Sequence, residues 1–191
     1  MDLKDSRTAR NLAAAFAGES QARNRYAYMA SAARKEGYVQ VAGIFEETAD
    51  QEKEHAKRLF RFMTGGEQPV SGAFPFGVIG STLANLRAAA AGERHEAEVM
   101  YPGMAADAEA EGFAEIAGVT RALVVAERQH GRRFAALADN IEQGKAFRRE
   151  DANTVWRCLN CGWLHAGAEA PERCGVCAHP KAYFELRGEN W

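Results

Sequence analysis

The pattern of apolar and polar residues predicts that most of the chain is helical. From about residue 5 to residue 142 the sequence is rich in Ala, Glu, Arg and Leu and has few runs of β-branched residues, which favours helices over strands. Gly37 and Gly112 interrupt this region where tight turns between helices are expected. The predicted helices span residues 5–35, 38–64, 80–110 and 113–143.

A long stretch without helical periodicity separates the two pairs of helices, from Thr64 to Gly77. About fifteen extended residues span roughly 50 Å, and a helix of about 27 residues is roughly 40 Å long. The stretch can therefore cross a bundle from one end to the other. The pattern predicts a mainly α protein, in which two antiparallel hairpins joined by one crossover form a ferritin-like four-helix bundle.

The two predicted hairpins resemble each other in sequence. Glu19 matches Glu93 at an offset of 74 residues, whereas Tyr26 matches Tyr101, and His55 matches His130, at an offset of 75. The second hairpin therefore contains one extra residue in its first helix. Such an insertion is often absorbed as a π-bulge, a feature that favours functional sites, so we predict a distorted turn near residues 97–102.

Charged residues interrupt the apolar seam of every predicted helix near its middle. Because residues three and four apart share a helix face, each Glu-x-x-His pair presents an oxygen and a nitrogen on that seam. Glu96 lies one turn from Glu93, on much the same face. The residues that interrupt the seams are Glu19, Glu52, His55, Glu93, Glu127 and His130.

Carboxylates that point inward are costly, because burying one uncompensated charge loses several kcal/mol even after relaxation. Two multivalent cations would balance these charges, and carboxylates could bridge them. Mixed Glu and His ligation suits iron or manganese better than calcium. A single Glu-x-x-His pair is commonly a chance surface feature. Two pairs at repeat-equivalent seam positions predict a dinuclear metal centre instead.

Other polar residues of the helices have simpler interpretations. Tyr26 and Tyr101 occupy repeat-related positions beyond Glu19 and Glu93, where they either pack in the core or donate a hydrogen bond to a metal-bound carboxylate. His95 is expected at the surface.

The four cysteines form two C-x-x-C pairs near the C-terminus, a spacing typical of a zinc or iron tetrathiolate site. A structural zinc ribbon is the simplest interpretation of the motif alone. Beside a redox-active dimetal site, an electron-transferring iron centre becomes the better one. We expect residues 1–146 to form the bundle and residues 153–191 to form a separate tetracysteine domain. The cysteines are Cys158, Cys161, Cys174 and Cys177.

Charge and hydropathy exclude several classes of function. The net charge of −2 leaves no electrostatic footprint for nucleic acid or an anionic membrane. The N-terminus lacks the apolar stretch of a signal peptide, and no apolar run approaches the ~18 residues of a membrane-spanning helix. We expect a cytoplasmic protein.

The motifs resemble those of the rubrerythrin family over nearly the whole chain. They are the paired Glu-x-x-His, Glu93–Glu96, Tyr101–Pro102 and the trailing C-x-x-C pairs. The resemblance implies a diiron centre, with His55 replacing a glutamate, Glu96 or its neighbour, at one iron on reduction. It also implies a rubredoxin-like iron on the four cysteines. The implied diiron ligands are Glu19, Glu52, Glu93, Glu96, Glu127 and His130.

One position departs from the family pattern. Rubredoxin-type knuckles usually carry Gly after the second cysteine of each pair, and Ala178 replaces it here. A positive φ is less comfortable for Ala than for Gly. The departure places the iron potential in doubt, though not the ligation.

The resemblance implies a peroxidase that reduces hydrogen peroxide to water, with electrons relayed through the iron tetrathiolate. It implies an upstream donor such as a rubredoxin or an NAD(P)H-linked reductase. A module tethered after about residue 150 lies near one end of the bundle, whereas the metal site lies in its middle, so we expect electron transfer between the subunits of a head-to-tail homodimer. The resemblance also implies dimers with helices exchanged at the 64–79 crossover. Zinc or manganese can replace iron in recombinant protein. The implied catalytic residues are the six diiron ligands together with Tyr26 and Tyr101.

Three other functions share parts of this pattern. A ferroxidase or iron-storage protein would use the same bundle, but it needs no electron input from a tetracysteine site. A non-enzymatic scaffold with a zinc ribbon would be colourless and redox-inactive. A diiron oxygenase ranks last, because nothing in the sequence indicates a pocket for an organic substrate.

Overall fold

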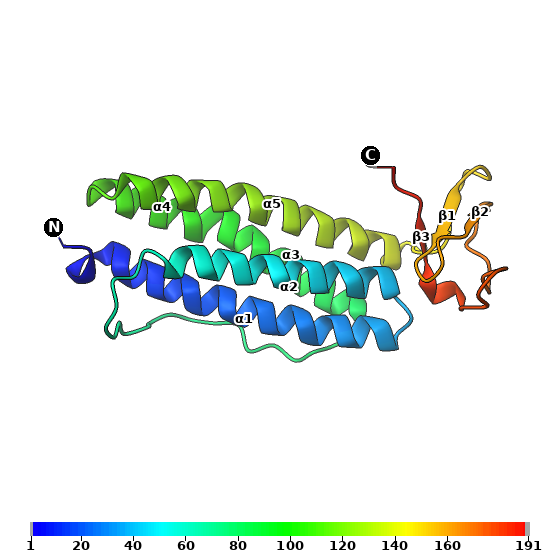
Figure 1. Cartoon of the computed structure of the whole chain (residues 1–191), viewed down its shortest axis with the longest axis horizontal. Helices are drawn as coiled ribbons and strands as arrows, with labels where there is room; N and C mark the ends of the chain where they lie inside the picture. The colour runs from blue at the N-terminus through cyan, green and yellow to red at the C-terminus, as the bar shows by residue number, and fades with distance from the viewer. Residues whose placement is uncertain (1, 190–191) are drawn as a thin grey trace.

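The computed structural model describes residues 2–189, and it consists of a long helical bundle with a small β module at one end (Figure 1). The bundle contains α1 (Arg7–Lys35), α2 (Val39–Phe60), α3 (Thr82–His95), α4 (Tyr101–Ala110) and α5 (Ala114–Glu142). A π-helical turn, Glu96–Met100, joins α3 to α4, so these two form the third rod of a four-helix bundle. The mainly α, ferritin-like prediction is therefore confirmed, as is the distorted turn expected near 97–102.

The two hairpin turns are built alike. Gly37 and Gly112 both adopt φ of 86°, a left-handed conformation that costs glycine little. The amide after each glycine then reaches back into the preceding helix: Tyr38 N–H donates to Ala33 O at 2.9 Å, and Phe113 N–H donates to Ala108 O at 2.8 Å. Each pair of long helices is thereby turned back on itself.

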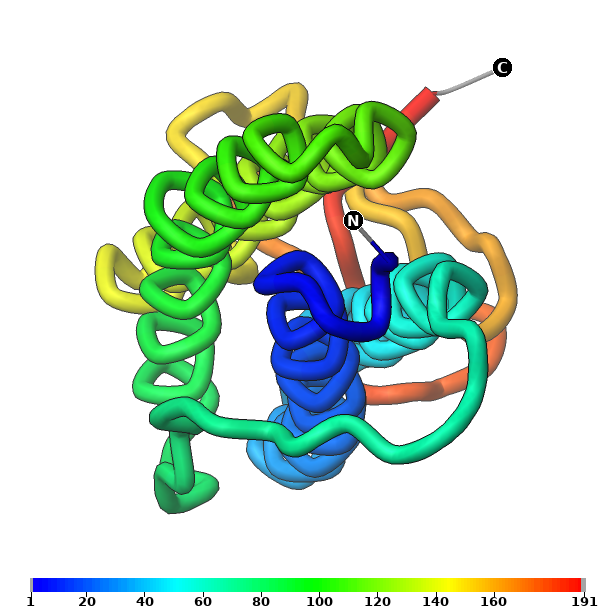
Figure 2. Tube along the Cα trace, turned by 90° about the vertical axis from the view of Figure 1, so that its left-hand side faces the viewer, coloured from blue at the N-terminus to red at the C-terminus, as the bar shows by residue number. Residues whose placement is uncertain are grey.

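The second helix ends earlier than predicted, at Phe60 instead of residue 64. Its last turn tightens, because the amides of Phe62 and Met63 donate to carbonyls three residues back, and Gly65 and Gly66 follow with positive φ. The connector to α3 then runs along the outside of α1 to the end of the bundle beside the β module (Figures 1 and 2). The connector thus crosses the bundle from one end to the other, as predicted.

Two apolar clusters fill the bundle, one toward each end. The cluster nearer the β module contains the aromatic rings of Tyr26, Phe45 and Phe134, with centroids of Phe45 and Phe134 5.0 Å apart. The cluster at the far end contains Leu12 and Leu59 among others. Between them, all four rods carry buried charged residues.

The C-terminal module is a three-stranded antiparallel sheet in the order β2-β1-β3, formed by β1 (Val155–Cys158), β2 (Leu164–Ala166) and β3 (Phe184–Leu186). Trp156 is fully buried at its centre, and its indole N–H donates to Gly167 O at 2.9 Å. The module adjoins the end of the bundle where Tyr38 stacks on Phe147, with ring centroids 5.9 Å apart. No helix within residues 2–189 is long and apolar enough to cross a membrane.

Candidate metal centres

The charged seam residues meet at one level of the bundle. α1 contributes Glu19, α3 contributes Glu93, and α2 and α5 each contribute a Glu and a His three residues apart. The four glutamates are at most 1 % exposed, and His130 is 3 % exposed. Burial of this many ionisable groups in one layer requires compensation by other charges.

Their donor atoms form two overlapping groups. The first contains Glu19, Glu52, His55 and Glu127, and the second contains Glu52, Glu93, Glu127 and His130; within each group the atoms lie within 4.8 Å of one another. Glu52 and Glu127 belong to both groups, which is the arrangement of bridging carboxylates.

The bridging geometry is nearly symmetric. Glu52 places one oxygen 2.8 Å from His55 Nδ1 and the other 3.0 Å from His130 Nδ1. Glu127 also directs one oxygen at each histidine, with each oxygen 3.1 Å from the facing Nδ1. The imidazole rings are nearly parallel, with centroids 5.8 Å apart. Each histidine nitrogen thus faces one oxygen from both shared glutamates.

Several of these atoms are buried without a hydrogen-bond partner, including both oxygens of Glu52 and Glu127 and Nδ1 of both histidines. Lone pairs that converge on common points, instead of facing donors, are what a metal ion needs. The donor set therefore fits two ions such as iron.

Without metal, protons must neutralise the cluster. Burial, together with repulsion from Glu52, Glu96 and Glu127, raises the pKa of Glu19 well above its usual value. Burial lowers the pKa of His130, but the close approach of Glu127 and Glu52 outweighs it and raises this pKa to about 11. Metal cations can supply the same positive charge and displace these protons.

Glu96 does not join either group. It lies half-buried in the π-helical turn, and His55 completes the first group in its place. Burial and repulsion from Glu93, Glu127 and Glu52 raise the pKa of Glu96, while Arg25 opposes the shift. Of the residues that the family resemblance implies as diiron ligands, Glu96 is the one that the structure leaves outside.

The two tyrosines are both buried and hydrogen-bonded. The Tyr26 hydroxyl donates to Glu93, and the Tyr101 hydroxyl donates to Glu19. Each hairpin therefore orients a carboxylate of the other hairpin. The extra residue is absorbed in the π-helical turn, where Tyr101 N–H donates to Glu96 O, and Tyr101 returns to the inner face with no exposed surface.

One supporting residue was not predicted from the sequence. Gln51 Oε1 lies 2.9 Å from His130 Nε2. If Nε2 carries the proton and donates it to Gln51, Nδ1 keeps a free lone pair that points at the cluster. The only signal in the sequence was its place next to Glu52, which does not reveal a contact with another helix.

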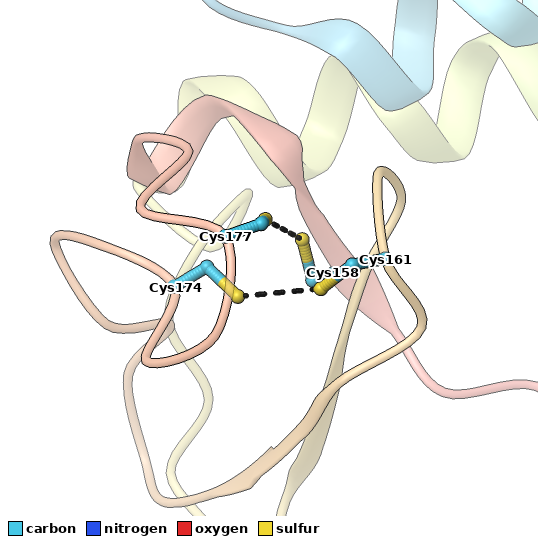
Figure 3. A group of neighbouring side chains, drawn as sticks. All are labelled: Cys158, Cys161, Cys174 and Cys177. Atoms are coloured by element: carbon cyan, nitrogen blue, oxygen red, sulfur yellow. Dashed lines mark hydrogen bonds between the residues drawn. The ribbon is translucent and has the colours of Figure 1, made fainter.

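The four cysteines converge between two loops of the C-terminal module (Figure 3). The Sγ atoms of Cys158 and Cys177 are 3.7 Å apart, and those of Cys161 and Cys174 are 3.5 Å apart. A tetrahedral ion with metal–sulfur bonds of about 2.3 Å separates its sulfurs by roughly 3.8 Å. The cysteines are free thiols that fit one such ion, and no disulfide joins them.

The two cysteine knuckles differ at one residue. Gly162 closes the first with φ of 79°, and Ala178 closes the second with φ of 58°. Their amides donate to Cys158 O at 2.8 Å and to Cys174 O at 3.0 Å. Ala178 therefore adopts the turn expected of glycine, at a steric cost of about 1–2 kcal/mol, and the cysteines still converge.

Comparison with known proteins assigns both parts of the chain. The family model described as Rubrerythrin matches residues 10–138, and the model described as Rubrerythrin, rubredoxin-like domain, matches residues 156–185. A rubrerythrin of Nitratidesulfovibrio vulgaris is 57 % identical over 99 % of this chain and 98 % of its own length. A rubrerythrin of Porphyromonas gingivalis is 52 % identical over 99 % of this chain and 94 % of its own length.

A solved structure of nigerythrin in a mixed-valence state also matches, with a TM-score of 0.62 and 32 % identity, over 96 % of this chain and 90 % of that chain. Family, fold and donor sets agree that the cofactor is iron, at a diiron centre and a rubredoxin-like site. The chain belongs to the rubrerythrin family, a family of iron oxidoreductases.

Proposed function

We propose that the protein is a peroxidase that reduces hydrogen peroxide to water at the dinuclear site, with electrons arriving through the tetracysteine iron. One observation carries this proposal: a buried Glu/His cluster for two ions and a tetrathiolate site occur in a single chain. Iron storage needs no electron input, so the second site favours a reductase over a ferroxidase.

The proposed dinuclear ligands are the residues of the two groups, Glu19, Glu52, His55, Glu93, Glu127 and His130. When bound, the irons supply Lewis acidity and the two electrons that cleavage of the O–O bond requires. The protein supplies orientation. Tyr26 and Tyr101 hold Glu93 and Glu19 in place, and Gln51 holds the His130 ring.

Glu96 is suited to a separate role in the same reaction. Burial and its acidic neighbours raise its pKa, so it holds a proton close to the cluster without belonging to either donor group. Conversion of one peroxide to two waters consumes two protons along with two electrons. We assign Glu96 to proton delivery in the reduced protein, and to exchange with His55 when the oxidation state changes.

The distance between the two sites favours transfer between subunits. From Glu127 to the end of α5 at Glu142, the helix alone rises about 22 Å at 1.5 Å per residue. The β module that carries the cysteines lies beyond that end (Figure 1). A head-to-tail homodimer would bring one subunit's tetracysteine site beside the other's dinuclear site. We assign residues 1–146 and 153–191 to these two functional domains. The donor is a rubredoxin or an NAD(P)H-linked reductase of the cytoplasm.

The test mixes iron-loaded, anaerobically reduced protein with hydrogen peroxide or with oxygen in a stopped-flow spectrometer. We expect the ferric-thiolate band to return rapidly with peroxide and much more slowly with oxygen. A Cys161→Ser variant, which removes one thiolate, should lose this band while the dinuclear site still reacts. Faster reaction with oxygen would support a ferroxidase instead, and absence of the band in the parent protein would mean that the tail does not carry redox-active iron.

A further inference from the structure

Two surface hollows flank the dinuclear site, and the internal repeat relates them. One lies between α1 and α2 and has a volume of about 520 Å³. The other lies between α3 and α5 and has a volume of about 330 Å³. At the offsets of 74 and 75 residues, Phe16 corresponds to Ala90 and Phe60 corresponds to Ala135. The two hollows are therefore counterparts with different linings.

An aromatic pair lines the first hollow. Phe16 and Phe60 pack with ring centroids 5.3 Å apart, and the lining of this hollow includes no residue of the dinuclear cluster. In the second hollow the corresponding side chains are methyl groups. Its lining includes Glu127, one of the two shared glutamates, whose side chain has no exposed surface. Although it is smaller, the α3–α5 groove is the one of the two whose lining includes a residue of the cluster.

A glycine forms part of the floor of this groove. A Cβ on Gly131 would lie 3.2 Å from the Cβ of Glu93 and 3.6 Å from Ala90 O. The counterpart in the first hairpin is Ala56. The absence of a side chain lets α5 pass close to α3 beside the cluster without displacing Glu93.

The mouth of the groove is positively charged. Arg94, Arg128 and Arg132 line it, with Glu98 as the acidic residue among them. None of the three arginines forms an ion pair within the described part of the chain, residues 2–189. By contrast, Arg121 and Arg133 of α5 pair with Glu109 and Glu47. Free guanidinium groups offer several N–H donors and repel cations.

We propose that the α3–α5 groove is the route by which small hydrogen-bond-accepting molecules reach the dinuclear site, and that its arginines favour anionic or neutral molecules over cations. The proposal rests on the proposed function for the identity of the oxidant, a peroxide. The shape of the route is independent of it. Ala90 and Ala135 are the residues that keep it open.

The test uses azide as the probe, with the oxidised, iron-loaded protein, and follows azide binding by visible absorption. The double variant Ala90→Phe with Ala135→Phe introduces, in the α3–α5 groove, the aromatic pair that the first hairpin carries. Ala135→Phe alone is the milder variant, because Ala135 is half-buried. We expect azide association to slow by at least an order of magnitude, and kcat/KM for peroxide to fall in parallel, at unchanged iron content.

Ala136→Phe is the matched control, since it introduces the same side chain at an exposed position of the same helix. It should leave azide association unchanged. Arg128→Gln with Arg132→Gln should slow azide association by roughly tenfold at low salt and flatten its dependence on ionic strength. An unchanged rate in this variant would overturn the assigned role of the arginines.

The two proposals fail in different ways. If Ala135→Phe keeps its iron and binds azide as fast as the parent protein, the groove is not the route, whatever the activity. If azide binding slows in that variant but the parent protein does not reduce peroxide, the groove stands and the peroxidase proposal fails.

Discussion

The two hairpins of the bundle carry the same pattern of metal-donor residues but differ in backbone and in surface residues. Both place a Glu-x-x-His pair on the second helix and a glutamate on the first, and each donates a tyrosine hydrogen bond to the other. Only the second has a π-helical turn, and only the first lines its outer hollow with an aromatic pair. The comparison teaches that the repeated residues supply the clustered donor atoms, while the residues that differ give one hairpin its π-helical turn and the other its aromatic pair.

The largest expected effect tests the equivalence of the two shared glutamates. Glu52→Ala and Glu127→Ala should each abolish binding of both bundle irons, because each residue belongs to both donor groups. The tetracysteine iron and its visible band should remain. Metal analysis of the purified variants measures this, with the exposed Glu54→Ala as control. A variant that kept one bundle iron would show that one of these glutamates does not bridge.

The reciprocal tyrosines are expected to have equal and smaller effects. Tyr26→Phe and Tyr101→Phe each remove a buried hydrogen bond to a carboxylate. Each should lower the free energy of unfolding by about 1.5–3 kcal/mol, the usual value for a hydrogen bond to a charged group. Urea denaturation of the iron-loaded protein measures this. If only one variant showed a lower free energy of unfolding, the two tyrosine hydrogen bonds would not be equivalent.

The two cysteine knuckles also share one pattern and differ at one residue, since Gly162 closes the first and Ala178 closes the second. Ala178→Gly should stabilise the C-terminal module by up to about 1 kcal/mol, because relief of the left-handed Ala exceeds the added flexibility of Gly in the unfolded chain. Gly162→Ala should have the opposite effect. Release of iron to a chelator, measured for both variants, reports the difference. Slower release from Gly162→Ala than from the parent protein would contradict this account.

The smallest expected effect concerns helix ends. Glu111, at the second hairpin turn, accepts hydrogen bonds from the amides of Arg7 and Thr8 at 2.9 and 2.8 Å and from the Thr8 hydroxyl at 2.6 Å. Glu36, its counterpart at the first turn, accepts one bond, from Thr82 N–H at 2.9 Å. Each hairpin thus caps the first helix of the other, but unequally.

These Thr8 and Arg7 contacts lower the pKa of Glu111 to about 2. A depressed pKa stabilises the fold above the ordinary value of 4.5, and this contribution is lost as the pH falls from there toward about 2. Near neutral pH, Glu111→Gln should therefore lower the melting temperature more than Glu36→Gln. The difference in melting temperature between the two variants should become smaller below pH 4.5. Melting curves at pH 6 and pH 3.5 would test this, and a gap that widens in acid would refute it.

The amino-acid sequence alone determined the helices, the hairpin turns, the layer of inward charges and the tetracysteine site. Helical periodicity places residues three and four apart on one face, so Glu52 and His55 had to share a side. Likewise, the change of offset from 74 to 75 residues already located the π-helical turn between Glu93 and Tyr101. Such features depend on spacing along one element, which the sequence states directly.

Only the tertiary structure decided which atoms of different helices meet. It joined His55 rather than Glu96 to the first donor group, set Gln51 against His130 and directed Glu111 to the start of α1. It also showed that the lining of the α3–α5 groove includes Glu127. Periodicity specifies the face on which a residue lies, but not the height and rotation at which packed helices face each other. Those follow from the packing of side chains along the whole bundle.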